Sequence, residues 1–183
     1  MPEPAPDTDG HRSSRRPRDL DVDREAPVLV ELSRTIDAPL PVVWRCHTDI
    51  DAWPSWQPDV SSARLDGAVE PGSTFEWQTH GLDITSTITQ VVLNSRIVWA
   101  GPAEGIHGIH VWTFTPTDEG VVVHTTESWS GPPVEADPDG LRANLTVSLA
   151  TWLDRLKEMC ESRGTDRTAG SAGEQRDARH DDD

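Results

Sequence analysis

The sequence predicts an α+β domain in which an antiparallel sheet is covered by a long C-terminal helix. Between residues 60 and 129, apolar side chains tend to alternate with polar ones in six short segments, as in β-strands. Short breaks separate these segments, and short links join antiparallel strands because parallel pairs need long crossovers. From residue 138 onward the apolar spacing becomes three and four, which is the period of a helix. Strands and helices are therefore segregated along the chain, which is typical of the α+β class.

The aromatic residues mark the part of the chain that folds. All eight Trp and both Phe lie between Trp44 and Trp152, whereas residues 1–27 and 163–183 contain none and are rich in charged residues. Such composition is typical of disordered segments. We therefore expect a disordered N-terminal arm at 1–27, one folded domain at 28–162 and a disordered C-terminal tail at 163–183.

The charge of the chain excludes some partners. The net charge is −16, and residues 28–162 alone hold 7 basic and 19 acidic residues. Nucleic acids and anionic membranes need clustered Lys and Arg, so neither is an expected partner. Cys46 and Cys160 are the only thiols, and no apolar stretch suits a signal peptide or a membrane span. The sequence predicts a cytoplasmic protein without membrane insertion and leaves the oligomeric state open.

The first elements form a strand and two short helices. Val28–Ile36 alternates as a strand does, and the following Asp37-Ala-Pro-Leu-Pro opens a helix, because Pro is tolerated in a first turn. This helix ends near Thr48-Asp49. A second short helix or turn, Ile50–Trp56, is interrupted by Pro54.

The remaining elements are six strands and the long helix. The expected strands are Val60–Leu65, Thr74–His80, Asp83–Leu93, Arg96–Ala100, Ile109–Thr115 and Val121–Trp129. Asp137 can cap the final helix and Pro138 fits its first position. The apolar stripe of this helix is formed by Leu141, Leu145, Leu149, Trp152, Leu156 and Met159.

Several stretches together resemble one superfamily, the START-like or SRPBCC proteins. They are Ile36-Asp-Ala-Pro, Val43-Trp44, Asp49–Trp56, Pro71–Trp77, Arg96–Gly101, His110–Pro116 and Glu127–Gly131. The resemblance covers roughly Val30–Glu161 and is strongest to the polyketide cyclase/dehydrase branch. It implies a helix-grip fold, in which a seven-stranded antiparallel sheet wraps around the C-terminal helix and encloses an apolar cavity. The Rieske branch of the superfamily is excluded, because two Cys without Cys-His spacing cannot hold its cluster.

Candidate ligand contacts follow from the alternation of side chains along the strands. His110, Trp112 and Phe114 share one face of their strand, and Trp152 lies on the helix face that meets the sheet. Ser86 shares a face with Ile84 and Ile88 and can orient a ligand hydroxyl. The residues expected to bind a ligand are Trp112, Phe114, Trp129, Trp152, Trp77, Ser86 and Leu149. For each Trp, packing of the core is the competing interpretation.

Glu127 and His110 are the candidate catalytic residues. Glu127 has the parity of Trp129, so an unbroken strand turns both side chains to the same face. A carboxyl group in an apolar cavity has a raised pKa and can act as a general acid or base, and a neighbouring His can also transfer protons. The alternative is that each residue is only structural. A β-bulge between Val121 and Trp129 would turn Glu127 outward.

The sequence favours ligand binding without a cofactor. It contains no phosphate-binding glycine motif, no nucleophile elbow and no metal-ligand motif, so no cofactor and no metal are expected. The first hypothesis is a protein that binds an apolar or aromatic small molecule, polyketide- or lipid-like. An alternative is a cofactor-free cyclase, aromatase or dehydratase that uses Glu127 and His110. A second alternative is a co-chaperone-like module, which would expose an apolar patch outside the cavity.

Overall fold

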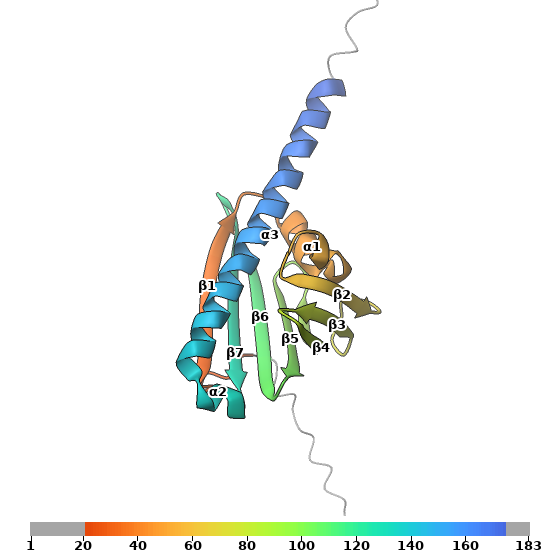
Figure 1. Cartoon of the computed structure of the whole chain (residues 1–183). Helices are drawn as coiled ribbons and strands as arrows, with labels where there is room; N and C mark the ends of the chain where they lie inside the picture. Colours follow the sequence, from red (N-terminus) through yellow and green to blue (C-terminus); the bar gives the residue numbers. More distant parts are fainter. Residues whose placement is uncertain (1–20, 175–183) are drawn as a thin grey trace, which may run out of the picture.

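The computed structural model describes residues 21–174 and shows one sheet that curves around a long helix (Figure 1). The elements are β1 (Val28–Ile36), α1 (Leu40–Thr48), η1 (Ile50–Ser55), β2 (Val60–Asp66), β3 (Thr74–Thr79), β4 (Leu82–Val92), β5 (Arg96–Ala103), β6 (Ile106–Thr117), β7 (Gly120–Ser130), α2 (Pro132–Ala136) and α3 (Pro138–Glu174). The seven strands pair antiparallel in the order β1-β7-β6-β5-β4-β3-β2. The predicted α+β helix-grip class is confirmed.

Tight hairpins connect most of the strands and explain the regular meander. Two-residue turns join β3 to β4 at His80-Gly81 and β5 to β6 at Glu104-Gly105, and all four residues have positive φ. Turns of this kind match the right-handed twist of the flanking strands. The predicted strands agree with β2–β7 to within three residues at either end. The sequence did not predict α2, because its opening Gly131-Pro132-Pro133 reads as a break.

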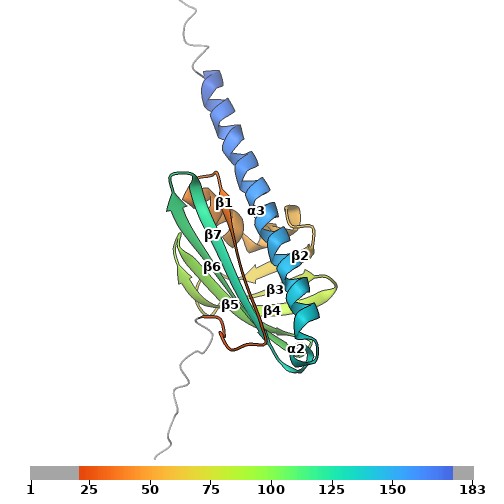
Figure 2. The same cartoon turned by 90° about the vertical axis from the view of Figure 1, so that its left-hand side faces the viewer.

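The predicted cap of the long helix is present. Asp137 Oδ1 accepts a hydrogen bond from the backbone N–H of Gly140 at 3.0 Å, and Pro138 occupies the first helical position. The helix lies against one face of the sheet (Figure 2) and its last turns continue beyond the sheet (Figure 1). Because α3 extends to Glu174, the helix continues past residue 162, where the sequence predicts the start of a tail.

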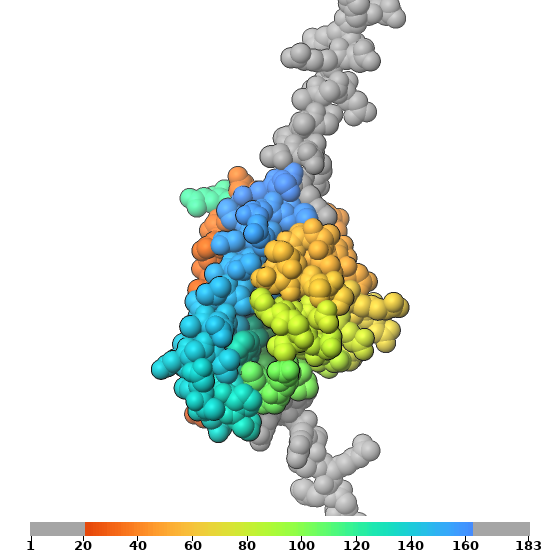
Figure 3. Space-filling view, viewed as in Figure 1, coloured from red at the N-terminus to blue at the C-terminus, as the bar shows by residue number. Residues whose placement is uncertain are grey.

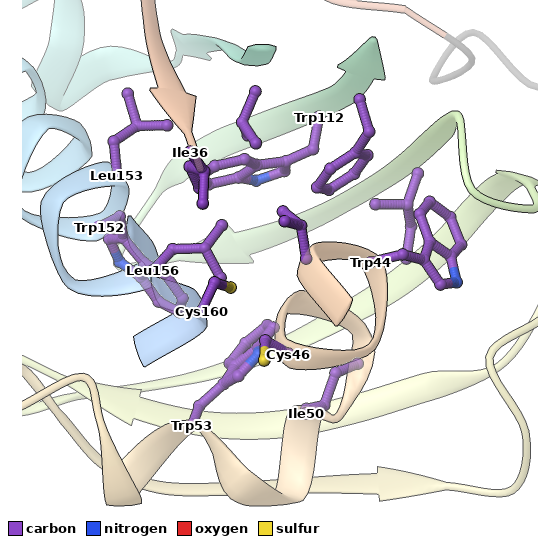
Figure 4. Packing of buried hydrophobic residues seen from close by; sticks show 14 of the residues in the cluster. Ile36, Trp44, Cys46, Ile50, Trp53, Trp112, Trp152, Leu153, Leu156 and Cys160 are labelled. Atoms are coloured by element: carbon purple, nitrogen blue, oxygen red, sulfur yellow. The ribbon is translucent and has the colours of Figure 1, made fainter. Parts of the chain in front are cut away.

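The main core fills the space between the sheet, α1, η1 and the middle of α3. Trp152, Leu153, Leu156 and Cys160 of α3 pack here against side chains from α1, η1 and the strands, as Figure 4 shows. A smaller apolar cluster joins β1, α2 and the first turns of α3 through Val28, Val30, Val134, Leu145 and Leu149. The two clusters hold α3 at both ends of its contact with the sheet.

The segment before β1 covers the opposite face of the sheet. Val22 is buried there with Val98, Ala100, Ile109 and Val111. The backbone N–H of Asp23 donates a hydrogen bond to Ser128 Oγ at 3.0 Å. The folded part therefore begins before residue 28, which corrects the predicted boundary of the arm. Residues 1–20 of that arm and 175–183 of the predicted tail lie outside the described residues. In the described chain, no helix combines the length and the apolar character that a membrane span requires.

Candidate functional site

A cavity of about 620 Å³ lies between the sheet and the first half of α3. Figure 3 shows the hollow from outside, between the first turns of α3 and the strands β3–β5. Its lining comes from β3–β7, from two hairpin turns and from α3, and it is mostly apolar or aromatic. The apolar and aromatic side chains are Trp77, Leu82, Ile84, Trp99, Ala103, Ile106, Trp129, Leu141, Leu145, Val147, Leu149 and Trp152.

Four tryptophans form much of the wall, and hydrogen bonds fix two of them. The indole N–H of Trp77 donates to Ser86 Oγ at 3.1 Å, and that of Trp129 donates to Glu127 Oε1 at 2.7 Å. Trp129 pairs across the sheet with Gly108, where a Cβ would lie 3.4 Å from the indole ring. The missing side chain at Gly108 leaves room for this ring beside Glu127.

Glu127 and His110 meet at the cavity wall. They are direct cross-strand partners on β6 and β7, and His110 Nδ1 lies 3.2 Å from Glu127 Oε2. The β6–β7 register runs without interruption from His107 to Thr117, so the bulge that would turn Glu127 outward is absent from this strand pair. The Glu127 side chain is 15% exposed and lines the cavity.

Burial controls the charge of this pair. Desolvation raises the pKa of Glu127 to about 7, although the hydrogen bond from Trp129 lowers it. Desolvation also lowers the pKa of His110 well below its ordinary value, and the nearby His47 lowers it further. At neutral pH the imidazole is therefore uncharged, and the carboxyl group is divided between its protonated and ionised forms. A group that titrates near the working pH is suited to general acid–base chemistry.

Thr125 orients the other side of the imidazole. His110 Nε2 lies 2.7 Å from Thr125 Oγ1, and both residues are buried. The ring is thus held at both nitrogens, with Nδ1 directed to Glu127. This arrangement can exchange one proton between carboxyl and imidazole beside a bound molecule. Within residues 21–162, whose side chains are described, no three His, Cys, Asp or Glu side chains are placed to hold a metal ion together.

The structure brings most of the sequence-predicted site residues to the cavity. Those that line it are Trp77, Ser86, His110, Glu127, Trp129, Leu149 and Trp152. Trp112 and Phe114 do not belong to the lining, contrary to expectation, and lie in the main core. They share the face of His110, but α1 covers this end of β6. Trp44 contacts Phe114 at 5.3 Å between ring centroids, and His47 contacts Trp112 at 4.5 Å.

Sequence reasoning did not select two residues near the site. Trp99 lines the cavity and lies 4.9 Å from His110 between ring centroids. His47 is fully buried and stacks on Trp99 with ring centroids 5.6 Å apart, and both of its ring nitrogens lack a hydrogen-bond partner. The alternation of side chains along β5 was the signal that could have identified Trp99, because Trp99 pairs directly with His110 across the sheet. A single His in a short helix gives no comparable signal.

The chain matches one family model along nearly the whole folded part. Residues 27–161 match the model described as polyketide cyclase / dehydrase and lipid transport. The chain belongs to this family. A curated relative named "Putative polyketide cyclase", from Streptomyces cyaneus, is 24% identical over 140 residues, which cover 68% of this chain and 91% of the relative.

Solved structures show the same fold as this polyketide cyclase/dehydrase family member. A START superfamily protein from Mycobacterium smegmatis superposes with a TM-score of 0.65 at 10% identity, covering 73% of this chain and 97% of that one. The di-domain aromatase/cyclase StfQ of the steffimycin biosynthetic pathway gives a TM-score of 0.62 at 20% identity, covering 74% of this chain and 51% of StfQ. At these identities the likeness establishes the START-like fold alone.

Proposed function

We propose that the protein binds a flat apolar or aromatic molecule, polyketide- or lipid-like, in the cavity between the sheet and α3. The observation that carries this proposal is the cavity itself, whose 620 Å³ falls within the range of about 300–1,000 Å³ typical of small-molecule sites. The membership in a family of cyclases and lipid carriers supports the same ligand class.

The tryptophans favour a planar ligand. Trp77, Trp99, Trp129 and Trp152 line the cavity from four different elements. Aromatic rings stack on flat ligands and add roughly 0.5–1.5 kcal/mol per pair beyond the buried area. The few polar groups, chiefly Ser86, His110 and Glu127, can then set the orientation of a ligand that carries hydroxyl or keto groups.

Native mass spectrometry of the purified protein tests this proposal first. A mass excess that is lost on denaturation identifies a bound molecule and its class. Binding is then measured with anthracene-9-methanol, a flat neutral probe, by the quenching of Trp fluorescence. We expect saturable quenching in the wild type.

A pair of variants on α3 locates the binding. Ser148 lines the cavity and is half-buried, whereas Ala143 is exposed and outside the lining. Ser148→Trp fills the cavity and should weaken probe binding at least tenfold, whereas Ala143→Trp should leave it unchanged. Equal binding by both variants and the wild type would contradict the proposed location.

The contact between His110 and Glu127 favours a second function, cofactor-free proton transfer on the bound molecule. We propose this for a cyclisation, dehydration or aromatisation, in which Glu127 removes or returns a proton and His110 shares it. The separation of 3.2 Å between Nδ1 and Oε2, at the cavity wall, supports the assignment. Neither the family nor the fold decides between binding and catalysis.

Hydrogen–deuterium exchange of 2-tetralone in heavy water tests the proton transfer. A general base beside the bound ketone should accelerate exchange of its α-protons relative to buffer, and Glu127→Gln should abolish the acceleration while the ketone still binds. Glu104→Gln, at the exposed cavity mouth, is the control that should retain exchange. A wild-type rate equal to that of buffer would refute this second function.

The co-chaperone-like alternative has no support among the residues with described side chains. Their exposed large apolar residues are Val92, Leu93 and Val147, and Val147 belongs to the cavity lining. We therefore do not propose a partner-binding role.

A further inference from the structure

Deep in the cavity, the ionisable groups of the lining are acidic or uncharged. Glu127 lies inside, while Asp59 and Glu104 lie farther out. Among the described lining residues there is no Lys or Arg. His110 is neutral at physiological pH because burial lowers its pKa. The other lining imidazole, His80, is exposed at the rim in the β3–β4 turn.

Six cations elsewhere in the domain are engaged with acids of their own. The ion pairs are Arg24–Glu31, Arg34–Asp154, Arg96–Asp21, Arg142–Asp139, Arg155–Glu158 and Lys157–Glu161. None of these residues belongs to the cavity lining. Arg142 lies in the same turns of α3 as residues at the cavity rim. It also donates a hydrogen bond to the carbonyl oxygen of Pro27, which directs its side chain toward β1. Among the residues with described side chains, an anion inside the cavity would therefore find no lining Lys or Arg as a counter-charge.

This distribution of charge determines which polar group a ligand can carry. A buried ion without a partner loses its hydration at a large free-energy penalty, and nearby like charges add repulsion. In this cavity a carboxylate or phosphate ester faces both the loss of hydration and the repulsion. A hydroxyl or keto group meets Ser86, Glu127 and His110 instead. An ammonium group meets acidic side chains and the faces of tryptophans, which attract cations.

We propose that the cavity selects its ligand by charge, taking apolar molecules whose polar group is neutral or cationic and excluding their carboxylate and phosphate counterparts. This inference rests on the proposed function of the cavity as a ligand site. It narrows the lipid-like class, because free fatty acids and phospholipids are excluded while neutral polyketides, sterol-like alcohols and amines remain.

Three probes of nearly equal shape test the inference in the full-length protein. They are anthracene-9-methanol, 9-(aminomethyl)anthracene and anthracene-9-carboxylate, titrated at about pH 8, where the amine is largely a cation and the acid an anion. The alcohol and the amine should bind at least tenfold more tightly than the carboxylate. Equal or tighter binding of the carboxylate overturns the charge selection but leaves the cavity as a ligand site. Failure of all three probes to bind overturns the proposed function, and the charge selection with it.

A charge placed at the rim supplies a second, independent readout. Asn144 is exposed and lines the cavity, whereas its neighbour Ala143 is exposed and does not. Asn144→Arg should raise the affinity for the carboxylate about tenfold relative to the affinity of the same variant for the alcohol. Ala143→Arg adds the same net charge and should have little effect. If both variants strengthen carboxylate binding equally, then the overall charge of the protein, and not the cavity lining, excludes anions, and the inference is wrong.

Discussion

Acid sensitivity of the fold should depend on His47, a residue that no ligand needs to touch. Its side chain is fully buried, and neither ring nitrogen has a hydrogen-bond partner. The ring lies among Trp53, Trp99, Trp112 and Phe114, with centroids 4.5–6.4 Å away. Burial lowers its pKa to about 3 from the ordinary 6.5. The folded protein therefore keeps this imidazole neutral in acid that would protonate it in the unfolded chain.

The sign and size of the effect follow from this pKa. Because the pKa in the folded state lies below that in the unfolded state, only the unfolded chain takes up the proton as the pH falls below about 6.5. Stability is complete above that pH and decreases progressively toward pH 3. At about pH 4.5 the loss through His47 amounts to about 3 kcal/mol, at roughly 1.4 kcal/mol per pH unit. That is a large share of the total stability of about 5–15 kcal/mol expected for a domain.

His47→Phe measures this contribution directly. Phenylalanine occupies a similar space in the aromatic cluster and breaks no hydrogen bond, since the ring nitrogens have none. Urea unfolding, followed by Trp fluorescence at about pH 7.5 and 4.5, gives the loss of stability over this interval. We expect the loss in His47→Phe to be about 3 kcal/mol smaller than in the wild type.

A control separates titration from packing. Trp112→Phe alters the same cluster without removing an ionisable group, so it should lower stability by a similar amount at both pH values. An equal loss of stability between the two pH values in His47→Phe and the wild type would refute the reasoning, because His47 would then not be the buried neutral group that it is in this structure.

Three further predictions follow from single side chains. Burial raises the pKa of Glu127 to about 7, so its contribution to stability is complete below about pH 4.5 and lost as the pH rises through 7. Between those pH values the wild type should lose up to about 3 kcal/mol of stability through Glu127, and Glu127→Gln should not show this loss in urea titrations. An equal loss of stability in both proteins would contradict the raised pKa. Gly101→Ala should destabilise the fold by about 1–3 kcal/mol in the same assay, because a Cβ would lie 2.5 Å from the backbone oxygen of Thr85. Val22→Ala should remove about 1–2 kcal/mol, since Val22 is only 6% exposed on the outer face of the sheet, and an unchanged midpoint would show that the segment does not pack there.

The alternation of side chains in the sequence predicted which residues share a face of the sheet. His110 and Glu127 have the parity of their neighbouring Trp residues, and the structure places the two side chains in contact across β6 and β7. The period of three and four in the last segment likewise predicted the face of α3 that meets the sheet, including Leu149 and Trp152. These features depend on local geometry, which each segment carries in its own residue order.

Only the tertiary structure decided what covers each part of that face. Trp112 and Phe114 have the parity of His110, yet α1 packs over them through Trp44 and His47 and turns their end of β6 into core. The cavity lies where the first half of α3 covers the sheet and α1 does not fill the space between them. Contacts between segments far apart in the chain determine this coverage, and alternation within one strand carries no information about them. For the same reason the sequence did not reveal the buried His47 or the segment that covers the outer face.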